Sequence, residues 1–391
     1  MTKTSPFGRT VPKAPERARV SQDVVKEAAR VLRSGEPAVL LLTGLALREK
    51  GLEFGARITA KTGARLLAQT FNRRMERGAG RISVERIPYP VEQALAMLAG
   101  VKHIVLVGSR VPVAFFAYPD KPSKLAPDDC QFVTLSRPEK VHARNSDGDE
   151  VESWLYPPLD PQPGKKYPLI LYIHGGPQSF DGDYFDTDLE NQVFAARGFA
   201  VLRVNYRGST SYGEKFCRSL WADWHRREYD DLMVSVDEAL KRPWIDGQRL
   251  GIGGWSYGGI MTVWTVAHTN RFRVGVPERF EIDYLSCFGE DQYFTQYLTE
   301  LGSPFENADL YRKLSPGTYI PNIKTPLFLI ADEKDGNCPP SQALQLYQRL
   351  KLLGIKTQLV IYPEETHTMS YPSHMVDRLN RLIGWYGQYL R

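Results

Sequence analysis

The chain has 391 residues, of which 42% are hydrophobic and 24% charged, and its formal net charge is +5. This composition is ordinary for a soluble globular protein. No apolar run approaches the ~18 residues that a membrane-spanning helix needs, which excludes a membrane protein. Because a single hydrophobic core stops growing at about 250–300 residues, the length predicts two domains.

The charge is unevenly distributed along the chain. Residues 1–136 contain 22 Lys and Arg against 12 Asp and Glu, whereas residues 137–391 contain 28 against 33. The two parts therefore differ in surface charge, as separate modules do. The basic residues of the first part are spread along amphipathic helices without interleaved aromatic side chains, so we do not expect a nucleic-acid partner.

The N-terminal stretch MTKTSPFGRTVPKAPERA is polar and proline-rich and lacks the apolar segment of a secretory signal. Residues 1–19 are expected to form a flexible arm of a cytoplasmic protein. The cysteines are scattered and form no CxxC motif, which predicts free thiols in a reducing compartment and no zinc site. There are four of them: Cys130, Cys217, Cys287 and Cys338.

Residues 20–136 alternate between strand and helix patterns. Short apolar runs at Ala38–Thr43, Ala64–Thr70 and His103–Val107 are typical of buried strands, and the first and last of them end at a glycine. Helical patterns at residues 46–63 and Val91–Leu98 lie between them. Such an alternation predicts a parallel sheet covered by helices on both faces, that is, a Rossmann-like α/β module.

Three segments of this module, GEPAVLLLTG, PYPVEQALAMLAG and VPVAFFAYPDKPSKLAP, resemble the central domain of acetolactate-synthase-type thiamine diphosphate enzymes. The resemblance covers about 120 residues. It implies a mainly architectural domain, because in that family the two flanking domains hold the cofactor. Neither flanking domain nor the family's GDG motif with its distant Asn is visible here, so we expect no cofactor.

The polar stretch Leu135–Ala143 is expected to mark a boundary, with residues 137–391 forming a second α/β domain. No series of short, evenly spaced β-blades is visible, so no β-propeller is expected. Helical patterns separate the predicted strands, and two of the helices are Gln342–Leu353 and Met375–Leu390. Val151–Tyr156 and a turn-rich segment lead into this series. Its strand patterns are Leu169–Ile173, Ala200–Val204, Leu250–Gly253, Phe272–Val276, Leu327–Ala331 and Gln358–Tyr362.

The sequence GIGGWSYGG at residues 251–259 contains Gly254-x-Ser256-x-Gly258 between a predicted strand and a predicted helix. A nucleophile elbow needs small residues at these positions, because its strained turn brings strand and helix close together. The alternative is a glycine-rich helix start that binds phosphate. A dinucleotide fingerprint would require a third glycine where Ser256 stands. We therefore predict that Ser256 is a catalytic nucleophile.

A serine hydroxyl needs a base to remove its proton, and in α/β hydrolases the acid and the histidine follow the serine in that order. His367 comes just after the last predicted strand and is the predicted base, whereas His374 is expected to face solvent or cap a helix. Asp335, in the loop after Leu327–Ala331, is the predicted acid, with Asp332 at the strand edge as the alternative.

The segment LYIHGGP at residues 171–177 places two glycines after a buried strand, where backbone N–H groups can approach a ligand. This pattern indicates half of an oxyanion hole, whose other half is the N–H of Tyr257, the residue after the nucleophile. The alternative is an ordinary strand-ending turn in which His174 is structural.

These motifs, together with VNYRGSTSYGEKF, DLMVSVDEAL, CPPSQALQLYQRLKLLG and YPEETH, resemble the catalytic domain of the prolyl oligopeptidase family, in particular its acylaminoacyl-peptidase branch. The resemblance covers residues 137–391. It implies a triad of Ser256, Asp335 and His367 and oxyanion donors at Tyr257 and Gly176. It also implies that Arg207 and Tyr212 lie in a supporting loop of the RGSxxYG type.

The chain departs from this family in three respects. A thiamine-enzyme-like module stands where the family carries a β-propeller, which predicts a fusion protein. The lead-in to the acid is ADEKD instead of HGExD. Glu278 and Glu281 occupy positions near which family members often have neutral residues. These differences leave the predicted mechanism intact and concern the choice of substrate.

We predict a serine hydrolase that acts on short peptides or acylated amino acids through an acyl-enzyme, with no metal and no cofactor. A carboxylesterase that acts on small acyl esters is the alternative. A non-catalytic binding or assembly fusion and a fragment of a thiamine-dependent carboligase are further alternatives. The expected partner is a small peptide or ester and not a membrane, and a homo-oligomer is compatible with the sequence.

Overall fold

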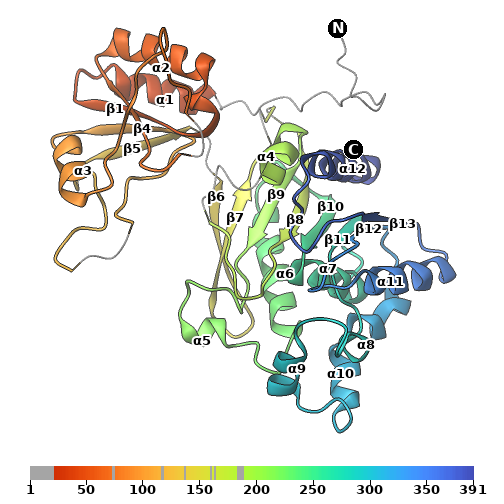
Figure 1. Ribbon diagram of the computed structural model, residues 1–391. Helices are drawn as coiled ribbons and strands as arrows, with labels where there is room; N and C mark the ends of the chain where they lie inside the picture. Colours follow the sequence, from red (N-terminus) through yellow and green to blue (C-terminus); the bar gives the residue numbers. More distant parts are fainter. Residues whose placement is uncertain are drawn as a thin grey trace. The chain divides into compact units, whose positions relative to one another are not determined.

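The computed structural model describes residues 22–72, 75–115, 119–135, 138–158, 161–162, 164–182 and 189–391 (Figure 1). The chain divides into two compact units. One consists mainly of residues 19–137, and the other of residues 138–182 and 190–391. We call them the N-terminal unit and the hydrolase unit. None of the described helices is both long and apolar enough to cross a membrane.

The N-terminal unit is built on a parallel sheet of five strands in the order β3-β2-β1-β4-β5. Its helices are α1 (Gln22–Leu32), α2 (Glu49–Thr62) and α3 (Val91–Leu98), and the turn η1 is Gly44–Leu47. Its strands are β1 (Ala38–Leu42), β2 (Arg65–Ala68), β3 (Glu85–Arg86), β4 (His103–Val107) and β5 (Gln131–Leu135).

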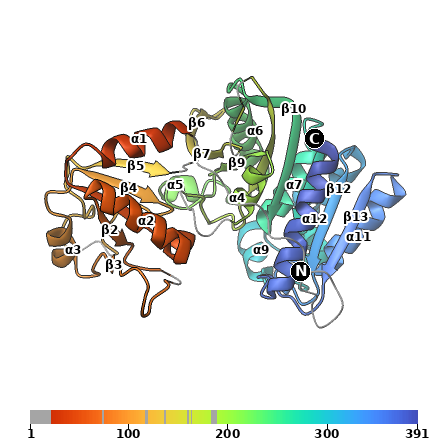
Figure 2. The same ribbon diagram turned by 90° about the horizontal axis from the view of Figure 1, so that it is seen from above.

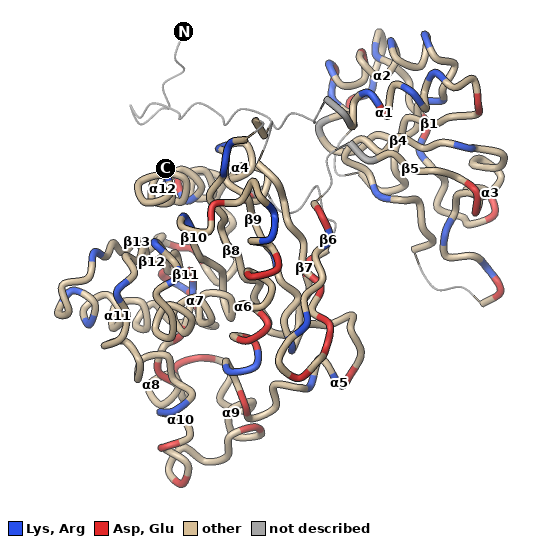
Figure 3. The backbone as a smooth tube through the Cα atoms, turned by 180° about the vertical axis from the view of Figure 1, so that it is seen from behind, with Lys and Arg blue, Asp and Glu red and all other residues tan. Residues whose placement is uncertain are grey.

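Side chains of β1 alternate between the two faces of this sheet, as the period of two in a strand requires. Val39 and Leu41 pack in a core with Leu98 of α3. Leu40 and Leu42 pack in the opposite core with residues of α1 and α2. Lys and Arg are frequent along α1 and α2 (Figure 3). The continuous apolar runs of the sequence therefore reflect strands covered on both sides.

The hydrolase unit contains a sheet of eight strands in the order β13-β12-β11-β10-β8-β9-β7-β6. Strand β7 pairs antiparallel with β6 and β9, and the other neighbours are parallel. This mixed sheet has the strand order of an α/β hydrolase. Its strands are β6 (Glu139–Arg144), β7 (Glu150–Tyr156), β8 (Tyr167–Ile173), β9 (Ala200–Val204), β10 (Ile245–Trp255), β11 (Val274–Glu278), β12 (Leu327–Asp332) and β13 (Thr357–Tyr362).

Helices cover both faces of the eight-stranded sheet (Figures 1 and 2). On one face α6 (Arg226–Leu240), α7 (Tyr257–His268) and α11 (Pro340–Leu352) bury their apolar stripes in a common core. On the other face α4 (Leu189–Ala196) and α12 (Pro372–Leu390) do the same. The remaining short elements of this unit are α5 (Glu214–Cys217), α8 (Tyr284–Cys287), α9 (Phe294–Leu301), α10 (Ala308–Leu314) and η2 (Pro316–Asn322).

The stretch expected to be a polar boundary contains a strand. Residues Glu139–Arg144 form β6, which pairs with β7 at the edge of the sheet. Val141 and Ala143 are buried while their neighbours along the strand are exposed, and this alternation is typical of an edge strand with one face on the core. Strand β11 begins at Val274, two residues later than the sequence pattern indicates.

Helix α7 lies unusually close to the sheet because glycines form the contact. A Cβ atom at Gly258 would lie 2.0 Å from the carbonyl oxygen of Ile173 in β8, and one at Gly254 would lie 2.5 Å from the same oxygen. The backbone of β8 cannot shift far enough to accept a Cβ atom at either position unless the helix moves as well. The glycines of the GxSxG motif therefore fix the distance between α7 and the central strands.

We expect Gly258→Ala to destabilise the hydrolase unit by roughly 3 kcal/mol or more, because the added methyl group collides with backbone. Urea unfolding followed by tryptophan fluorescence measures this, since all seven tryptophans lie in residues 138–391. Gly384→Ala is the control. A Cβ there meets nothing within 4 Å, and a helical alanine should stabilise by about 0.5–1 kcal/mol. Equal midpoints for the two variants would contradict this account of the contact.

Candidate active site

Ser256 occupies the turn between β10 and α7 with φ 61° and ψ −127°. Positive φ is uncommon for a residue with a Cβ, and it persists only where the surroundings enforce it. Here the Ser256 N–H donates to the carbonyl oxygen of Glu278 at 3.0 Å, which ties the turn to the end of β11. The serine side chain therefore stands at the carboxyl end of the sheet, beside the N-terminus of a helix.

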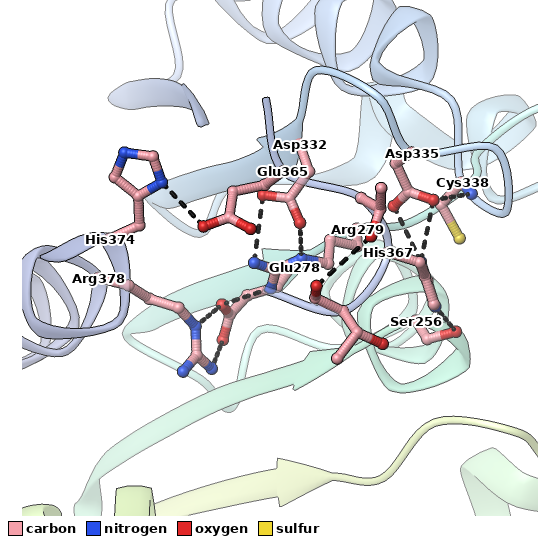
Figure 4. A network of polar contacts seen from close by, with 12 residues as sticks. Ser256, Glu278, Arg279, Asp332, Asp335, Cys338, Glu365, His367, His374 and Arg378 are labelled. Carbon is pink, nitrogen blue, oxygen red and sulfur yellow. Dashed lines mark hydrogen bonds and ion pairs between the residues drawn. The ribbon is translucent and has the colours of Figure 1, made fainter. Parts of the chain in front are cut away.

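A chain of hydrogen bonds joins Ser256 to the predicted histidine and acid (Figure 4). His367 follows β13, and its Nε2 lies 2.9 Å from Ser256 Oγ. Its Nδ1 lies 2.8 Å from Oδ2 and 3.1 Å from Oδ1 of Asp335. The carboxylate favours the tautomer with the proton on Nδ1, which leaves Nε2 free to accept the serine proton.

Asp335 is buried and held in place by backbone donors. Its Oδ1 accepts hydrogen bonds from the N–H groups of Asn337 at 2.8 Å and of Cys338 at 3.0 Å. Its side chain is fully buried, whereas that of His367 is 16% exposed. A carboxylate fixed in this way orients the imidazole without moving itself.

The two alternative residues have other partners. Asp332 ends β12 and forms a buried ion pair with Arg279, whose Nη2 lies 3.2 Å from Oδ1. His374 places Nδ1 2.8 Å from Oε1 of Glu365. Glu365 also accepts hydrogen bonds from residues 370 and 371, so His374 helps to fix the loop that carries His367. The geometry therefore favours Asp335 over Asp332 and His367 over His374.

The residues predicted to supply oxyanion donors lie beside the serine. Tyr257 is the first residue of α7, so its N–H has no carbonyl four residues back within the helix. Gly176 follows β8 with φ 125°, and a Cβ on the preceding Gly175 would lie 2.9 Å from Cβ of Ser256. Gly176, Ser256 and Tyr257 line one cavity of about 420 Å³.

Aromatic and acidic side chains form much of the remaining wall of this cavity. Its volume lies within the range of about 300–1,000 Å³ that ligand pockets usually have. Beyond the predicted residues, side chains from the segments around α5, α8 and α9 contribute. They include Trp224, Tyr284, Tyr293, Tyr297, Glu281 and Glu300.

A buried cluster behind Tyr257 has no motif that would reveal it in the sequence. The Tyr257 hydroxyl donates to Oε1 of Glu228 at 2.5 Å and lies 3.2 Å from Nδ1 of His225. His225 Nε2 lies 2.9 Å from the hydroxyl of Tyr284. Burial lowers the pKa of His225 to about 3 and raises the pKa of Glu228 to about 7, so the ring is neutral near pH 7. The cluster fixes the residue that follows the nucleophile.

The loop that contains Arg207 and Tyr212 is anchored by hydrogen bonds to α6 and β7. Arg207 is buried, and its Nε lies 3.0 Å from both carboxylate oxygens of Asp231 in α6. The Tyr212 hydroxyl donates to Glu152 of β7 at 2.8 Å. These contacts tie the loop to two elements of the hydrolase unit.

The two acidic departures from the family occupy different environments. Glu278, at the end of β11, lies 2.5 Å from Nε of Arg378 and accepts a hydrogen bond from the Tyr172 hydroxyl at 2.9 Å. It is part of a buried structural network (Figure 4). Glu281 lies in the wall of the cavity beside Ser256 and accepts from the hydroxyl of Tyr297 at 2.9 Å. Of the two acidic residues that depart from the family pattern, Glu281 is therefore the one that lines the cavity.

The strand order and the Ser–His–Asp hydrogen bonds are those of an α/β hydrolase with a nucleophile elbow. The chain belongs to the prolyl oligopeptidase family, whose model matches residues 185–391. It is 36% identical over 338 residues to an uncharacterized peptidase of Bacillus subtilis, YuxL, covering 79% of this chain and 50% of that protein.

Two further relatives cover different shares of the chain. An acylaminoacyl peptidase of Pyrococcus horikoshii superposes with a TM-score of 0.61 at 30% identity, covering 65% of this chain and 42% of that one. A putative acetolactate synthase large subunit of Mycobacterium tuberculosis, IlvX, is 51% identical over 124 residues, which are 32% of this chain and 24% of that protein. The chain thus spans half or less of the length of these relatives.

The buried Glu228 carboxyl should make the stability of the hydrolase unit depend on pH. Its pKa is raised to about 7 in the folded state from an ordinary value of 4.5, so the unfolded chain loses this proton first as the pH rises. The stability that the folded state gains by holding this proton is fully present below pH 4.5 and is lost at pH values above 7. We expect the wild-type protein to lose about 2–3 kcal/mol more than Glu228→Gln between pH 5 and pH 8.5.

Urea unfolding at the two pH values, followed by tryptophan fluorescence, measures this difference. Glutamine keeps an oxygen that can accept from the Tyr257 hydroxyl, so the variant removes the titration while retaining the bond. Parallel pH profiles for wild type and variant would show that Glu228 does not titrate in this range.

Proposed function

We propose that the chain is a serine hydrolase that acts through an acyl-enzyme on short peptides or acylated amino acids. The observation that carries the proposal is the 2.9 Å contact between Ser256 Oγ and His367 Nε2, on an imidazole whose Nδ1 is bonded to Asp335. The family to which the chain belongs supports the same class of reaction.

In the proposed mechanism, His367 takes the proton from Ser256 as its oxygen attacks the scissile carbonyl. Asp335 stabilises the imidazolium that forms. His367 then gives the proton to the leaving amine, which departs and leaves the acyl group on Ser256. A water molecule, deprotonated by the same imidazole, releases the acid and restores the serine.

We also propose that the N–H groups of Tyr257 and Gly176 bind the oxyanion of the tetrahedral intermediate. Their places on either side of Ser256, at the wall of the same cavity, support this role. Losing one such donor typically costs ~3 kcal/mol of transition-state stabilisation. The helix dipole of α7 favours negative charge at the same point.

For the N-terminal unit we propose a Rossmann-like module with an architectural role and no cofactor, joined to the hydrolase as a fusion. The parallel strand order β3-β2-β1-β4-β5 and the similarity to part of a putative acetolactate synthase subunit support it. We also propose a cytoplasmic location, which the four unpaired cysteines support.

We expect a fluorophosphonate probe to label the wild-type protein at Ser256 and not to label Ser256→Ala. Peptide mapping of the modified residue is the measurement. In the same preparation, rates on an acetylated alanine anilide and on a short-chain nitrophenyl ester distinguish a peptidase from an esterase. Labelling at another residue, or equal labelling of the variant, would refute the assignment of the nucleophile.

Asp335→Asn should lower kcat by roughly 10⁴-fold, because the neutral amide no longer favours the productive tautomer of His367. Asp332→Asn is the matched control. It should change kcat by less than ~10-fold but lower the free energy of unfolding, because Arg279 loses its buried partner. Steady-state kinetics and urea unfolding of both variants test this, and a reversed pattern would make Asp332 the acid.

A further inference from the structure

Glu281 lines the cavity, and it shares its hydrogen-bond donor with a second carboxyl group, that of Asp291. The Tyr297 hydroxyl lies 2.9 Å from Oε2 of Glu281 and 2.8 Å from Oδ2 of Asp291. A hydroxyl has one proton and can donate it to only one of them at a time. Glu281 is 3% exposed, and its Oε1 has no hydrogen-bond partner among the described residues.

No Lys or Arg in the described part of the chain forms an ion pair with Glu281 or Asp291. Burial, and secondly the charge of Asp291, raise the pKa of Glu281 well above its usual range, and burial raises that of Asp291. None of the other titratable groups that act on Glu281 or share its surroundings is cationic; they are Asp335, Cys287, Cys338, Tyr284 and Tyr297. A hydrogen bond with Asp291 contributes to the raised pKa of Glu281, so the pair holds a shared proton in place of the positive partner that buried carboxylates normally have.

The side chains around this pair are suited to a cation. Trp224, Tyr284 and Tyr297 contribute aromatic rings to the cavity, and ring faces attract an ammonium or guanidinium group. Glu300 adds a further carboxyl group, which accepts a hydrogen bond from Nε1 of Trp224 at 2.7 Å. Arg218 also lines the cavity, but its guanidinium group is paired with Glu214 at 3.0 Å, so the carboxyl groups and aromatic rings favour a cation over an anion.

We propose that Glu281, with Asp291 behind it, forms a specificity subsite for a positively charged side chain, lysine or arginine, of the residue whose carbonyl acylates Ser256. The cavity begins at Ser256, Tyr257 and Gly176, so a side chain on the carbon next to the scissile carbonyl enters it. This inference rests on the proposed function. A bound cation supplies the charge that the pair lacks, and it favours the ionised form of Glu281.

A metal ion is the competing occupant of the cluster. One ligand atom each from Glu281, Cys287 and Asp291 lies within 4.8 Å of the others. Metal ligation by cysteine requires the thiolate, and burial raises the pKa of Cys287. A thiol that stays protonated is a poor metal ligand, which disfavours a metal ion at this cluster.

The test compares acetyl-arginine and acetyl-citrulline anilides, which have nearly the same shape but differ in charge. We expect the wild-type enzyme to prefer arginine by 10²-fold or more in kcat/KM. Glu281→Gln should reduce this ratio to below about 5. Glu290→Gln, which removes an exposed carboxyl group of the same segment, should leave the ratio unchanged.

Ser256 labelling by a fluorophosphonate shows separately whether the hydrolase itself is active. A labelled wild-type enzyme that cleaves citrulline and arginine substrates equally would overturn the subsite and leave the proposed function standing. A protein that neither labels nor cleaves would overturn both. An arginine preference that disappears with EDTA would assign the cluster to a metal and overturn the subsite. If Glu281→Gln does not fold, the arginine-to-citrulline ratios of the wild-type enzyme and of Asp291→Asn still test the subsite.

Discussion

The close approach of α7 to β8 is the constraint on which the rest of the site depends. Gly254 and Gly258 allow the helix to start directly above the sheet, with Ile173 O too near for any side chain between them. The chain can then pass from β10 to α7 only through a single strained residue, Ser256. A strained position of this kind costs of order 1–3 kcal/mol, which the surrounding packing must offset. Ser256 therefore owes its place to these glycines as well as to the hydrogen bond of its N–H with Glu278.

A buried ionic network stiffens the strand ends from which the site is built. Asp332 pairs with Arg279, whose Nη1 lies 3.5 Å from Glu278, and Glu278 pairs with Arg378 of α12 (Figure 4). Breaking one member of such a network is costly, because it leaves an unpaired charge out of water. The backbone of Glu278 in turn accepts from the Ser256 N–H. The network thus connects the elbow with β11, β12 and α12.

The chemistry of the site could be predicted because it is local in sequence. The GxSxG motif indicates a sharp turn between a strand and a helix. Asp335 and His367 each follow a strand whose apolar run is easy to recognise. Asp332 instead pairs with Arg279, and no local pattern reveals this pairing. The cluster of His225 and Glu228 depends on packing between α6 and α7, so sequence analysis missed it.

The central strands of both sheets could also be predicted from the sequence, but the edge strands β3 and β6 could not. Central strands read as continuous apolar runs because both faces are covered, whereas edge strands carry a weaker signal. Strand β6 alternates polar and apolar residues over only six positions, and β3 has two residues, so neither was predicted. Helix α1 was also missed, although Ala28, Val31 and Leu32 are buried at helical spacing.

Glu278 and Glu281 are separated by only two residues, yet their side chains have different surroundings. Glu278 still belongs to β11, and its carboxylate is neutralised by arginine. Past the strand end the chain turns at Arg279, which has φ 49°, and Glu281 then reaches the cavity wall, where tyrosine is its donor. One acid therefore serves the scaffold and the other is available to a ligand. Near the end of a strand the direction of the turn, rather than the residue type, decides which role a buried charge has.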